Sequence, residues 1–317
     1  MIDPAARGSE TRFGTRPGAT QRRAGPRRRR RRGGWLVAPA IVVATVLAAC
    51  GPDDQLGDVE AVTQAESPTV EAEAVHPDFS FTLDELVALM GTARGADTEA
   101  LQDRPEYFLE LVAAALRTPI ELLQLVDKEH PLPEDYVPDD LVAATDFPLV
   151  VNRSDMLLRA PIMPDLVAMS TAARLDGVVL DLSSGYRSYD YQAGLFERHV
   201  ADLGLEEARR VSAEPGRSQH QLGTTIDFGS ITPAFADTAA GRWLAEHAWR
   251  FGFSLSYPDG FEELTGYMYE SWHFRYLGRK ATTLEREFFG GIQQYMLEFL
   301  AENRVTLSRA FTGGGQG

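Results

Sequence analysis

The sequence of 317 residues lacks several features that define common protein classes. It contains one cysteine, Cys50, so no disulfide can form within the chain. Its apolar run at residues 35–49 is about 15 residues long, shorter than the ~20 residues that span a bilayer comfortably. A phosphate-binding loop motif, internal repeats and a regular strand–helix–strand rhythm are also absent, which disfavours a doubly wound α/β fold. The 44% of hydrophobic residues suffice for one sizeable core plus a smaller attachment.

The N-terminus has the order of a secretory signal. Eleven Arg residues occur within residues 1–32, and an apolar segment ending in Leu-Ala-Ala-Cys follows them. These last four residues resemble the bacterial lipobox, which implies that Cys50 is lipidated and becomes the new N-terminus. An uncleaved signal anchor is the alternative, and a start downstream of Met1 would shorten the basic region. We expect residues 1–50 to be a signal peptide with a lipobox.

Charge separates the basic N-terminus from the rest of the chain. Removing the eleven Arg and two acidic residues of residues 1–49 changes the formal net charge from −15 to −24. A domain this acidic repels phosphate backbones, so we expect no nucleic-acid partner. An exported, acidic domain without disulfides fits the cell-envelope surface. We therefore expect an extracytoplasmic protein held on a bacterial membrane or envelope by its lipid anchor.

The chain after the signal divides by composition and periodicity. Thr82 and Glu85 form a capping box at the start of a helical pattern. Two further helical patterns, at residues 105–118 and 119–129, begin with Pro at the first helical position. We expect an acidic disordered linker, a helical segment, a main domain, and a C-terminal helix with a disordered tail, at residues 51–79, 80–129, 130–288 and 289–317.

Helices and short strands alternate irregularly in the main domain, which favours an α+β fold. Periodicity and turn residues predict helices in three stretches, at residues 160–177, 189–204 and 239–253. Apolar and alternating patterns predict strands in three others, at residues 178–188, 224–229 and 271–278.

Two of the six histidines lie in stretches that are dense with polar and turn residues. His220 precedes Asp227 by seven positions, and Gly223 between them lets the chain turn so that both could approach one ion. His273 follows Glu270 by three positions. A hydrolytic zinc site needs three ligands from His and carboxylates, an open position for water and a nearby base. A lone His and Asp at this spacing also occur as structural residues, so the spacing alone leaves both interpretations open.

Three ordered motifs resemble those of VanY-type zinc D-alanyl-D-alanine carboxypeptidases. Residues 218–227, Ser-Gln-His-Gln-Leu-Gly-Thr-Thr-Ile-Asp, resemble the S-x-H-x-x-G-x-A-x-D signature of that family. Thr225 stands where the family usually has Ala, and its added hydroxyl needs a hydrogen-bond partner. Residues 270–273 resemble the family's E-x-W-H, and residues 184–192 resemble its S-G-Y-R-S-x-x-x-Q segment. The resemblance covers roughly residues 130–285.

The resemblance implies one active site. Its Zn²⁺ ligands would be His220, Asp227 and His273. Glu270 would be the catalytic base and Arg187 the cation that stabilises the oxyanion, while Ser218 and Gln192 would hold the terminal carboxylate of the substrate. The residue types suit these roles, because two neutral imidazoles and one carboxylate leave the zinc with a net positive charge. A carboxylate at the position of Glu270 can accept a proton from water and pass it to a leaving amine.

The resemblance also implies a fold and a reaction. The fold would be a compact α+β domain of the hedgehog/DD-peptidase type, with a small antiparallel sheet flanked by helices and the zinc at the edge of the sheet. The reaction would be removal of the C-terminal D-Ala from peptidoglycan stem peptides. Alternatives are an L,D-carboxypeptidase, a D,D-dipeptidase or endopeptidase, and a non-catalytic zinc-containing module that binds the cell wall. Glu270 argues against the last, because a binding module has no need of a base.

Overall fold

The computed structural model describes residues 73–313. The predicted signal peptide with Cys50, and residues 51–72 of the predicted linker, lie outside this range, as do residues 314–317 of the predicted tail. Within the described part of the chain, no helix is both long and apolar enough to cross a membrane.

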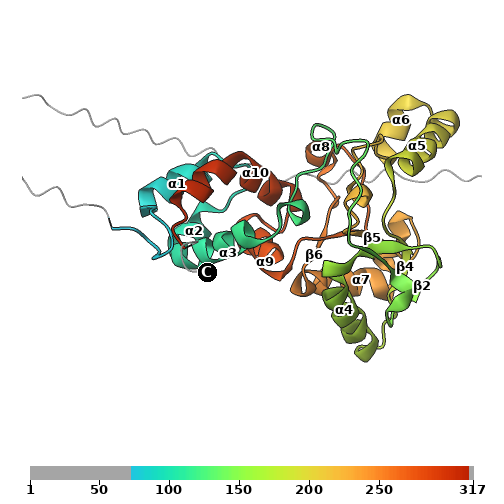
Figure 1. The fold of residues 1–317 in the computed structure, drawn as a ribbon, viewed down its shortest axis with the longest axis horizontal. Coiled ribbons are helices and arrows are strands. Elements are labelled where there is room, and N and C mark those ends of the chain that lie inside the picture. Colours follow the sequence, from blue (N-terminus) through green and yellow to red (C-terminus); the bar gives the residue numbers. More distant parts are fainter. Residues whose placement is uncertain (1–72, 314–317) are drawn as a thin grey trace, which may run out of the picture. The chain divides into compact units, whose positions relative to one another are not determined.

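A five-stranded sheet with the strand order β2-β4-β5-β7-β6 lies in the main domain (Figure 1). Its strands in chain order are β2 (Val150–Val151), β4 (Asp181–Ser184), β5 (Thr225–Phe228), β6 (Phe253–Leu255) and β7 (His273–Tyr276). All neighbours are antiparallel except β2 and β4, which are parallel. The α+β prediction is confirmed, with one parallel pair at the edge of the sheet. A separate antiparallel pair joins β1 (Leu141–Ala143) to β3 (Leu157–Arg159).

The two faces of this sheet differ in chemistry. On the apolar face, Ile226 and Phe274 pack in a buried cluster with helices α4 (Met163–Leu175) and α7 (Ala239–His247). The opposite face, which we call the polar face, carries the alternate residues of β5 and β7, namely Thr225, Asp227, His273 and Arg275, all of them buried. The period of two along each strand therefore separates core packing from candidate chemistry.

A second apolar cluster joins helices from the two ends of the described chain. We call these five helices the helical layer: α1 (Leu83–Gly91), α2 (Thr98–Asp103), α3 (Pro105–Arg117), α9 (Arg279–Phe288) and α10 (Gln293–Ala310). Phe108 of α3 contacts both Phe288 of α9 and Phe299 of α10 within one buried cluster. Figure 1 shows these helices side by side. The helical segment predicted at residues 80–129 thus shares its core with the C-terminal helix.

The helical segment itself follows the sequence signals in part. The capping box is confirmed, since the amide of Glu85 donates to the Thr82 hydroxyl at 3.3 Å. The helix predicted over residues 119–129 is wrong, because only the turn Ile120–Leu122 is helical. The carbonyls of Leu122 and Gln124 accept hydrogen bonds from the buried Arg275 instead of from helical amides. A distant side chain therefore replaces the local hydrogen bonds that a helix would make.

The remaining predictions for the main domain hold with shifted boundaries. The helices at residues 160–177, 189–204 and 239–253 correspond to α4, α5 (Tyr189–Leu203) and α7. The last of these ends at His247 and continues as a 3-10 turn over Ala248–Phe251, which left-handed Gly252 terminates before β6. The three predicted strands correspond to β4, β5 and β7. Short elements that periodicity did not indicate are β1, β2, β3, β6, α6 (Leu205–Val211) and α8 (Glu262–Thr265).

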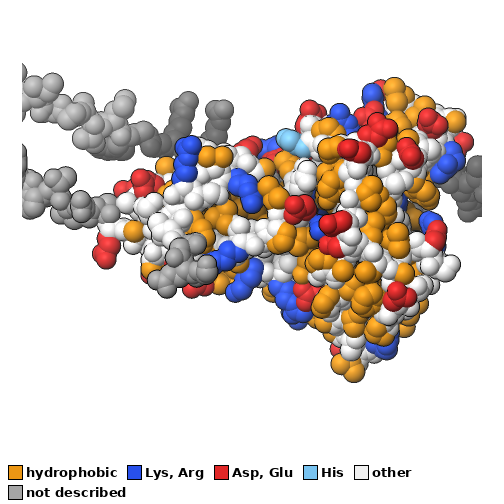
Figure 2. Space-filling view, in the orientation of Figure 1, with side chains coloured by type: hydrophobic (Ala, Val, Ile, Leu, Met, Phe, Trp, Pro, Cys, Tyr) orange, Lys and Arg blue, Asp and Glu red, His pale blue; other side chains and the backbone are white. Residues whose placement is uncertain are grey.

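Charges of both signs cover the surface of the described residues. Figure 2 shows acidic and basic side chains interspersed with apolar ones on the face in view. Some form exposed ion pairs, such as Arg94 with Glu298 and Arg279 with Asp165. Solvent screens such pairs, so the two apolar clusters dominate the stability of the fold.

Candidate metal centre and active site

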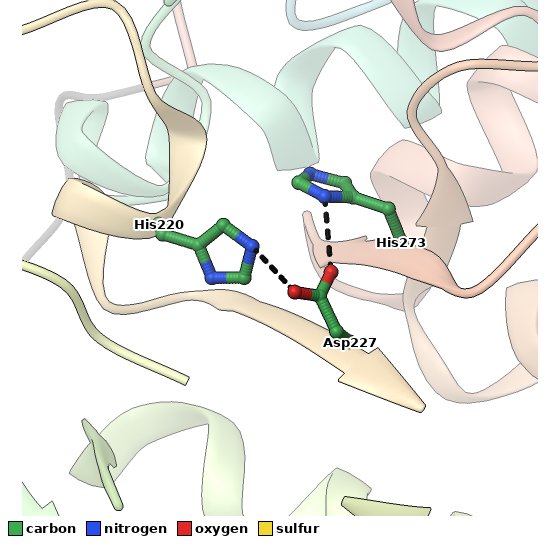
Figure 3. A group of neighbouring side chains, drawn as sticks. All are labelled: His220, Asp227 and His273. Atoms are coloured by element: carbon green, nitrogen blue, oxygen red, sulfur yellow. Dashed lines mark ion pairs between the residues drawn. The ribbon is translucent and has the colours of Figure 1, made fainter. Parts of the chain in front are cut away.

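Three buried side chains converge on the polar face of the sheet (Figure 3). His220 comes from the short helical turn Gln219–Leu222, Asp227 from β5 and His273 from β7. Each offers one ligand atom, and these atoms lie within 4.8 Å of one another. Nε2 of His220 is 3.2 Å from Oδ2 of Asp227, and Nδ1 of His273 is 3.2 Å from Oδ1 of the same carboxylate. The three predicted ligands therefore form one group that can hold a metal ion.

The local backbone explains why these residues meet. Gly223 is left-handed, with φ 71°, and turns the chain between the helical turn of His220 and strand β5. On β5, Asp227 lies directly opposite His273 of the antiparallel strand β7. Directly opposed side chains on one face of an antiparallel pair are about 4.5–5.5 Å apart at Cβ, which suits two ligands of one ion.

The hydrogen bonds around the three side chains fit a bound cation. Nδ1 of His220 lies 2.7 Å from the carbonyl of Gly185, so this nitrogen carries the proton and Nε2 keeps its lone pair. Nε2 of His220 is buried without a hydrogen-bond donor among the described residues, and it faces a second acceptor, Oδ2 of Asp227, at 3.2 Å. Buried acceptors of this kind are costly unless they are partnered, and a metal ion would partner both.

The pKa shifts of the same three residues bear on how they would bind a cation. Burial lowers the pKa of His220 to about 4, and the Arg187 cation acts in the same direction. Burial alone would raise the pKa of Asp227, yet His220 and Arg187 hold it well below its usual range. Burial would also lower the pKa of His273, but its contacts with Asp227 and Glu270 raise it to about 9. A cation would thus meet an ionised carboxylate and a neutral imidazole, and would compete with a proton at His273.

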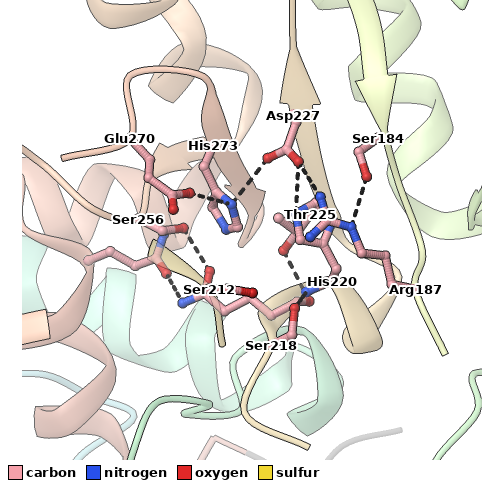
Figure 4. A network of polar contacts seen from close by, with 12 residues as sticks. Ser184, Arg187, Ser212, Ser218, His220, Thr225, Asp227, Ser256, Glu270 and His273 are labelled. Atoms are coloured by element: carbon pink, nitrogen blue, oxygen red, sulfur yellow. Dashed lines mark hydrogen bonds and ion pairs between the residues drawn. The ribbon is translucent and has the colours of Figure 1, made fainter. Parts of the chain in front are cut away.

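Glu270, the predicted base, lies beside the ligand group. Its Oε2 contacts Nδ1 of His273 (Figure 4), at a distance of 3.3 Å. Its side chain is 13% exposed. The amide of His273 donates to the carbonyl of Glu270 at 3.2 Å, which closes the turn before β7. Trp272 packs into the apolar cluster and also borders the cavity in front of the site. The E-x-W-H segment therefore turns an acid and a ligand to one side and an aromatic ring to the core.

Arg187 reaches the site from the loop after β4. Its Nη2 donates to Oδ2 of Asp227 at 2.6 Å, and its Nε donates to the hydroxyl of Ser184 at 3.0 Å (Figure 4). The guanidinium therefore neutralises and orients one ligand carboxylate while it borders the same cavity. The ion pair with Asp227 is a contact that the sequence motif did not predict.

Ser218 and Gln192 both border the cavity, and both are buried. The hydroxyl of Ser218 caps the helical turn by accepting the amide of His220 at 3.3 Å. The amide nitrogen of Gln192 donates to the carbonyl of Ala213 at 2.8 Å and to the hydroxyl of Ser212 at 3.4 Å. The bond to Ser212 is the longer and therefore the weaker of the two. The N–H that makes it is thus available to donate to a bound substrate instead.

The cavity that contains these groups has a volume of about 450 Å³. Two of its lining residues, Tyr257 and Tyr267, were missed by the sequence interpretation. The Tyr257 ring lies 4.8 Å from the imidazole of His273 and 4.8 Å from the Tyr267 ring. Tyr267 stands three positions before Glu270, and this closeness to a motif is the signal that could have indicated it. The cavity is thus lined by the polar groups of the site and by aromatic side chains.

Comparison with known proteins finds similar carboxypeptidases. The family model of VanY, described as D-alanyl-D-alanine carboxypeptidase, matches residues 155–279. The Bacillus subtilis protein YodJ, whose name describes a carboxypeptidase, is 30% identical over 271 residues, which cover 82% of this chain and 94% of that protein.

Two solved structures are similar to part of this chain. The LD-carboxypeptidase LdcB, whose structure is described as revealing peptidoglycan recognition, is 33% identical with a TM-score of 0.51, covering 55% of this chain and 84% of that chain. The vancomycin-resistance D,D-dipeptidase VanXYg, solved with a D-Ala-D-Ala phosphinate analogue, is 28% identical with a TM-score of 0.50, covering 56% of this chain and 70% of that chain.

The α+β fold and a His-Asp-His group beside an acid define a peptidase domain with a candidate metal centre. Within this class, the chain belongs to the VanY family of D-alanyl-D-alanine carboxypeptidases. The motif residues that carried the resemblance all lie within the matched range.

Proposed function

We propose that this protein is a zinc-dependent carboxypeptidase that removes the C-terminal D-Ala from peptidoglycan stem peptides ending in D-Ala-D-Ala. The observation that carries the proposal is the joint placement of His220, Asp227 and His273 with Glu270 in one cavity. Two imidazoles and one carboxylate are a usual donor set of catalytic zinc sites, which leave a fourth position open.

Glu270 is the proton carrier of the proposed reaction. When bound, zinc supplies a Lewis acid that lowers the pKa of water to about 7. Glu270, with its Oε2 at 3.3 Å from Nδ1 of His273, takes a proton from the attacking water and passes it to the amine that leaves. Its partial exposure to the cavity gives it access to water and substrate, while the buried ligands are held in place beneath it.

Arg187 and Ser218 supply fixed donors around the reacting carbonyl and the terminal carboxylate. Arg187 is held by Ser184 and Asp227, so its guanidinium does not have to reorganise as negative charge develops. Desolvating a free carboxylate costs free energy unless donors replace the lost water. The Ser218 hydroxyl accepts from the backbone, which leaves its own proton for a substrate oxygen.

Digestion of defined stem peptides tests the proposed specificity. A pentapeptide ending in D-Ala-D-Ala is expected to become a tetrapeptide with release of one D-Ala, in the presence of zinc and in spite of penicillin. The comparisons also include an LD-carboxypeptidase and a D,D-dipeptidase, so the products decide among three activities. Mass spectrometry that shows release of intact D-Ala-D-Ala, or cleavage of the tetrapeptide alone, would refute the D,D-carboxypeptidase assignment.

We further propose that the mature protein is held on the outer side of a bacterial membrane by a lipid on Cys50. The support is the sequence order of an Arg-rich region, an apolar run and Leu-Ala-Ala-Cys. Cys50→Ser is expected to accumulate an unlipidated precursor, because the thiol is the acceptor of the lipid. Mass spectrometry of the wild-type protein that finds an unmodified N-terminus containing Met1 would contradict the anchor.

A further inference from the structure

Two buried glutamines connect the candidate metal centre to the helical layer. Gln219 directly precedes His220, and Gln293 is the first residue of α10. The two residues are 3% and 1% exposed, and Nε2 of Gln219 donates to Oε1 of Gln293 at 3.2 Å. Helix α10 lies beyond residues 155–279, which match the family model. The contact therefore joins the metal centre to a part of the chain outside the matched family region.

Ser256 completes a closed group of hydrogen bonds with these two residues. Its hydroxyl donates to Oε1 of Gln219 at 2.7 Å, and Nε2 of Gln293 donates to that hydroxyl at 3.2 Å (Figure 4). Each side-chain oxygen and nitrogen of both glutamines thus has a partner. A buried group in which every side-chain polar atom has a partner resists displacement, because a shift leaves a desolvated amide unpaired.

Thr225 adds a second restraint on Gln219. Its hydroxyl donates to the carbonyl of Gln219 at 3.1 Å (Figure 4). Thr225 is the position that departs from the family signature, and the carbonyl of Gln219 is the partner that its extra hydroxyl requires. The backbone of Gln219 is held by β5 and its side chain by α10, so the peptide unit leading into His220 is fixed from two sides.

We propose that Gln293 is a positioning residue of the metal centre, which acts through Gln219 on the backbone of His220. The proposal rests on the proposed function only in that His220 must be a metal ligand. Apolar side chains could join α10 to the sheet without desolvating four amide atoms, whereas this network fixes one relative placement. A metal site depends on ligand placement to within about 0.5 Å, so a rigid support for His220 affects affinity.

Metal affinity of the full chain tests this role. Zn²⁺ alone is titrated against a chromophoric chelator, and thermal unfolding is recorded in EDTA. Gln293→Met keeps the side-chain shape and removes both polar atoms. We expect it to weaken zinc binding about tenfold, as loss of a supporting contact around a metal site does. The visible spectrum of the Co²⁺-substituted protein should change in the same variant, because the ligand geometry changes.

Gln294 provides a matched control on the same helix. It is also buried, and its Nε2 donates to Asp127 at 2.8 Å and to Glu298 at 3.0 Å, away from the loop of His220. Gln294→Met is expected to lower the unfolding temperature in EDTA much as Gln293→Met does, yet to keep the zinc affinity and the Co²⁺ spectrum of the wild type. A purely structural role of Gln293 would make the two variants alike in every measurement.

A double variant tests whether Gln293 acts through Gln219. If it does, Gln219→Met with Gln293→Met weakens zinc binding no more than Gln219→Met alone, because the second change removes a contact already lost. Independent, multiplicative losses would overturn the proposed route. Wild-type zinc affinity in Gln293→Met would overturn the positioning role while the proposed function stands. Failure of the wild type to bind zinc in a His220-dependent manner would overturn both.

Discussion

The two faces of the five-stranded sheet use alternate residues of the same strands and are stabilised in different ways. On the apolar face, Ile226 and Phe274 are stabilised by exclusion from water and by packing. On the polar face, Asp227 and His273 are equally buried, but each polar atom there needs a partner. The apolar face therefore tolerates changes that preserve volume, whereas the polar face depends on the identity of each contact. Substitutions on the two faces should separate stability from chemistry.

The largest effect is expected from the ligands of the polar face. His220→Ala and His273→Ala should each lose stoichiometric zinc and lower kcat/KM by about 10³-fold or more, because the Lewis acid is lost. Phe274→Ala, one residue from a ligand, should instead cost about 3–5 kcal/mol of stability, since it leaves a cavity in the core. Zinc content, kcat/KM and the free energy of unfolding in denaturant are measured for the three variants and the wild type.

Two outcomes would contradict the separation of stability on the apolar face from metal binding on the polar face. If the zinc content of folded His220→Ala equals that of the wild type, the ligand assignment is wrong. If Phe274→Ala loses zinc while it remains folded, the two faces are not separable. Thermal unfolding curves of the variants give their transition temperatures, and zinc content is compared below the lowest of these, where every variant is folded.

The next effect concerns Glu270, which lies beside the ligands without being one of the three. Glu270→Ala should retain zinc and lower kcat by about 10²–10⁴-fold, the range that a positioned general base contributes. Zinc content and single-turnover kinetics with a pentapeptide stem separate this outcome from ligand loss. Wild-type turnover in Glu270→Ala would exclude this residue as the base.

The sequence predicted that His220, Asp227 and His273 meet, because they lie in short motifs on a helical turn and two paired strands. His220 and Asp227 are seven positions apart, and Asp227 meets His273 through strand register. The alternating patterns of β5 and β7 also indicated which residues face the core. Local patterns of this kind act through hydrogen bonds and strand geometry that the sequence encodes at short range.

Contacts between distant segments could not be predicted in the same way. Gln219 and Gln293 are separated by 74 positions, and Arg275 holds the carbonyl of Leu122 across 153 positions. Gln293 and Arg275 have no local signal, because a buried polar residue is indistinguishable in sequence from an exposed one. The missing helix at residues 119–129 has the same cause, since a tertiary hydrogen bond replaced the helical ones.

A smaller effect is expected from Glu285, a buried acid near the polar face. Burial raises its pKa to about 8, although the Ser254 hydroxyl that donates to it at 2.8 Å acts in the opposite direction. Between about pH 4.5 and 8, the folded state therefore holds a proton at this group that the unfolded state releases. The contribution of Glu285 to the free energy of unfolding is therefore fully present below pH 4.5, and it is lost as the pH rises from there through about 8.

Glu285→Gln should remove this contribution, because the amide is neutral at every pH. We expect the free energy of unfolding of the wild type, relative to this variant, to fall between pH 5 and pH 8, as measured by urea denaturation. Glu302, which is exposed on α10, provides the control, and Glu302→Gln should leave the slope unchanged. Parallel pH profiles of wild type and Glu285→Gln would show that Glu285 is ionised in the folded protein.

The smallest effect is expected from Gln192, which borders the cavity but already donates to the protein. Its bond to Ala213 at 2.8 Å holds the side chain, while the 3.4 Å contact with Ser212 is weak enough to be exchanged for a substrate carboxylate. Amidation of the terminal carboxylate should reduce kcat/KM strongly in the wild type. Gln192→Ala should lower the ratio of kcat/KM for the free acid to kcat/KM for the amide by about tenfold at most, since the Ser218 hydroxyl still donates to the carboxylate. Kinetics with the matched acid and amide peptides give this ratio directly, and Ser218→Ala serves as the comparison. An unchanged ratio in Gln192→Ala, with a reduced ratio in Ser218→Ala, would assign the carboxylate to Ser218 and leave Gln192 as a support of the loop at Ala213.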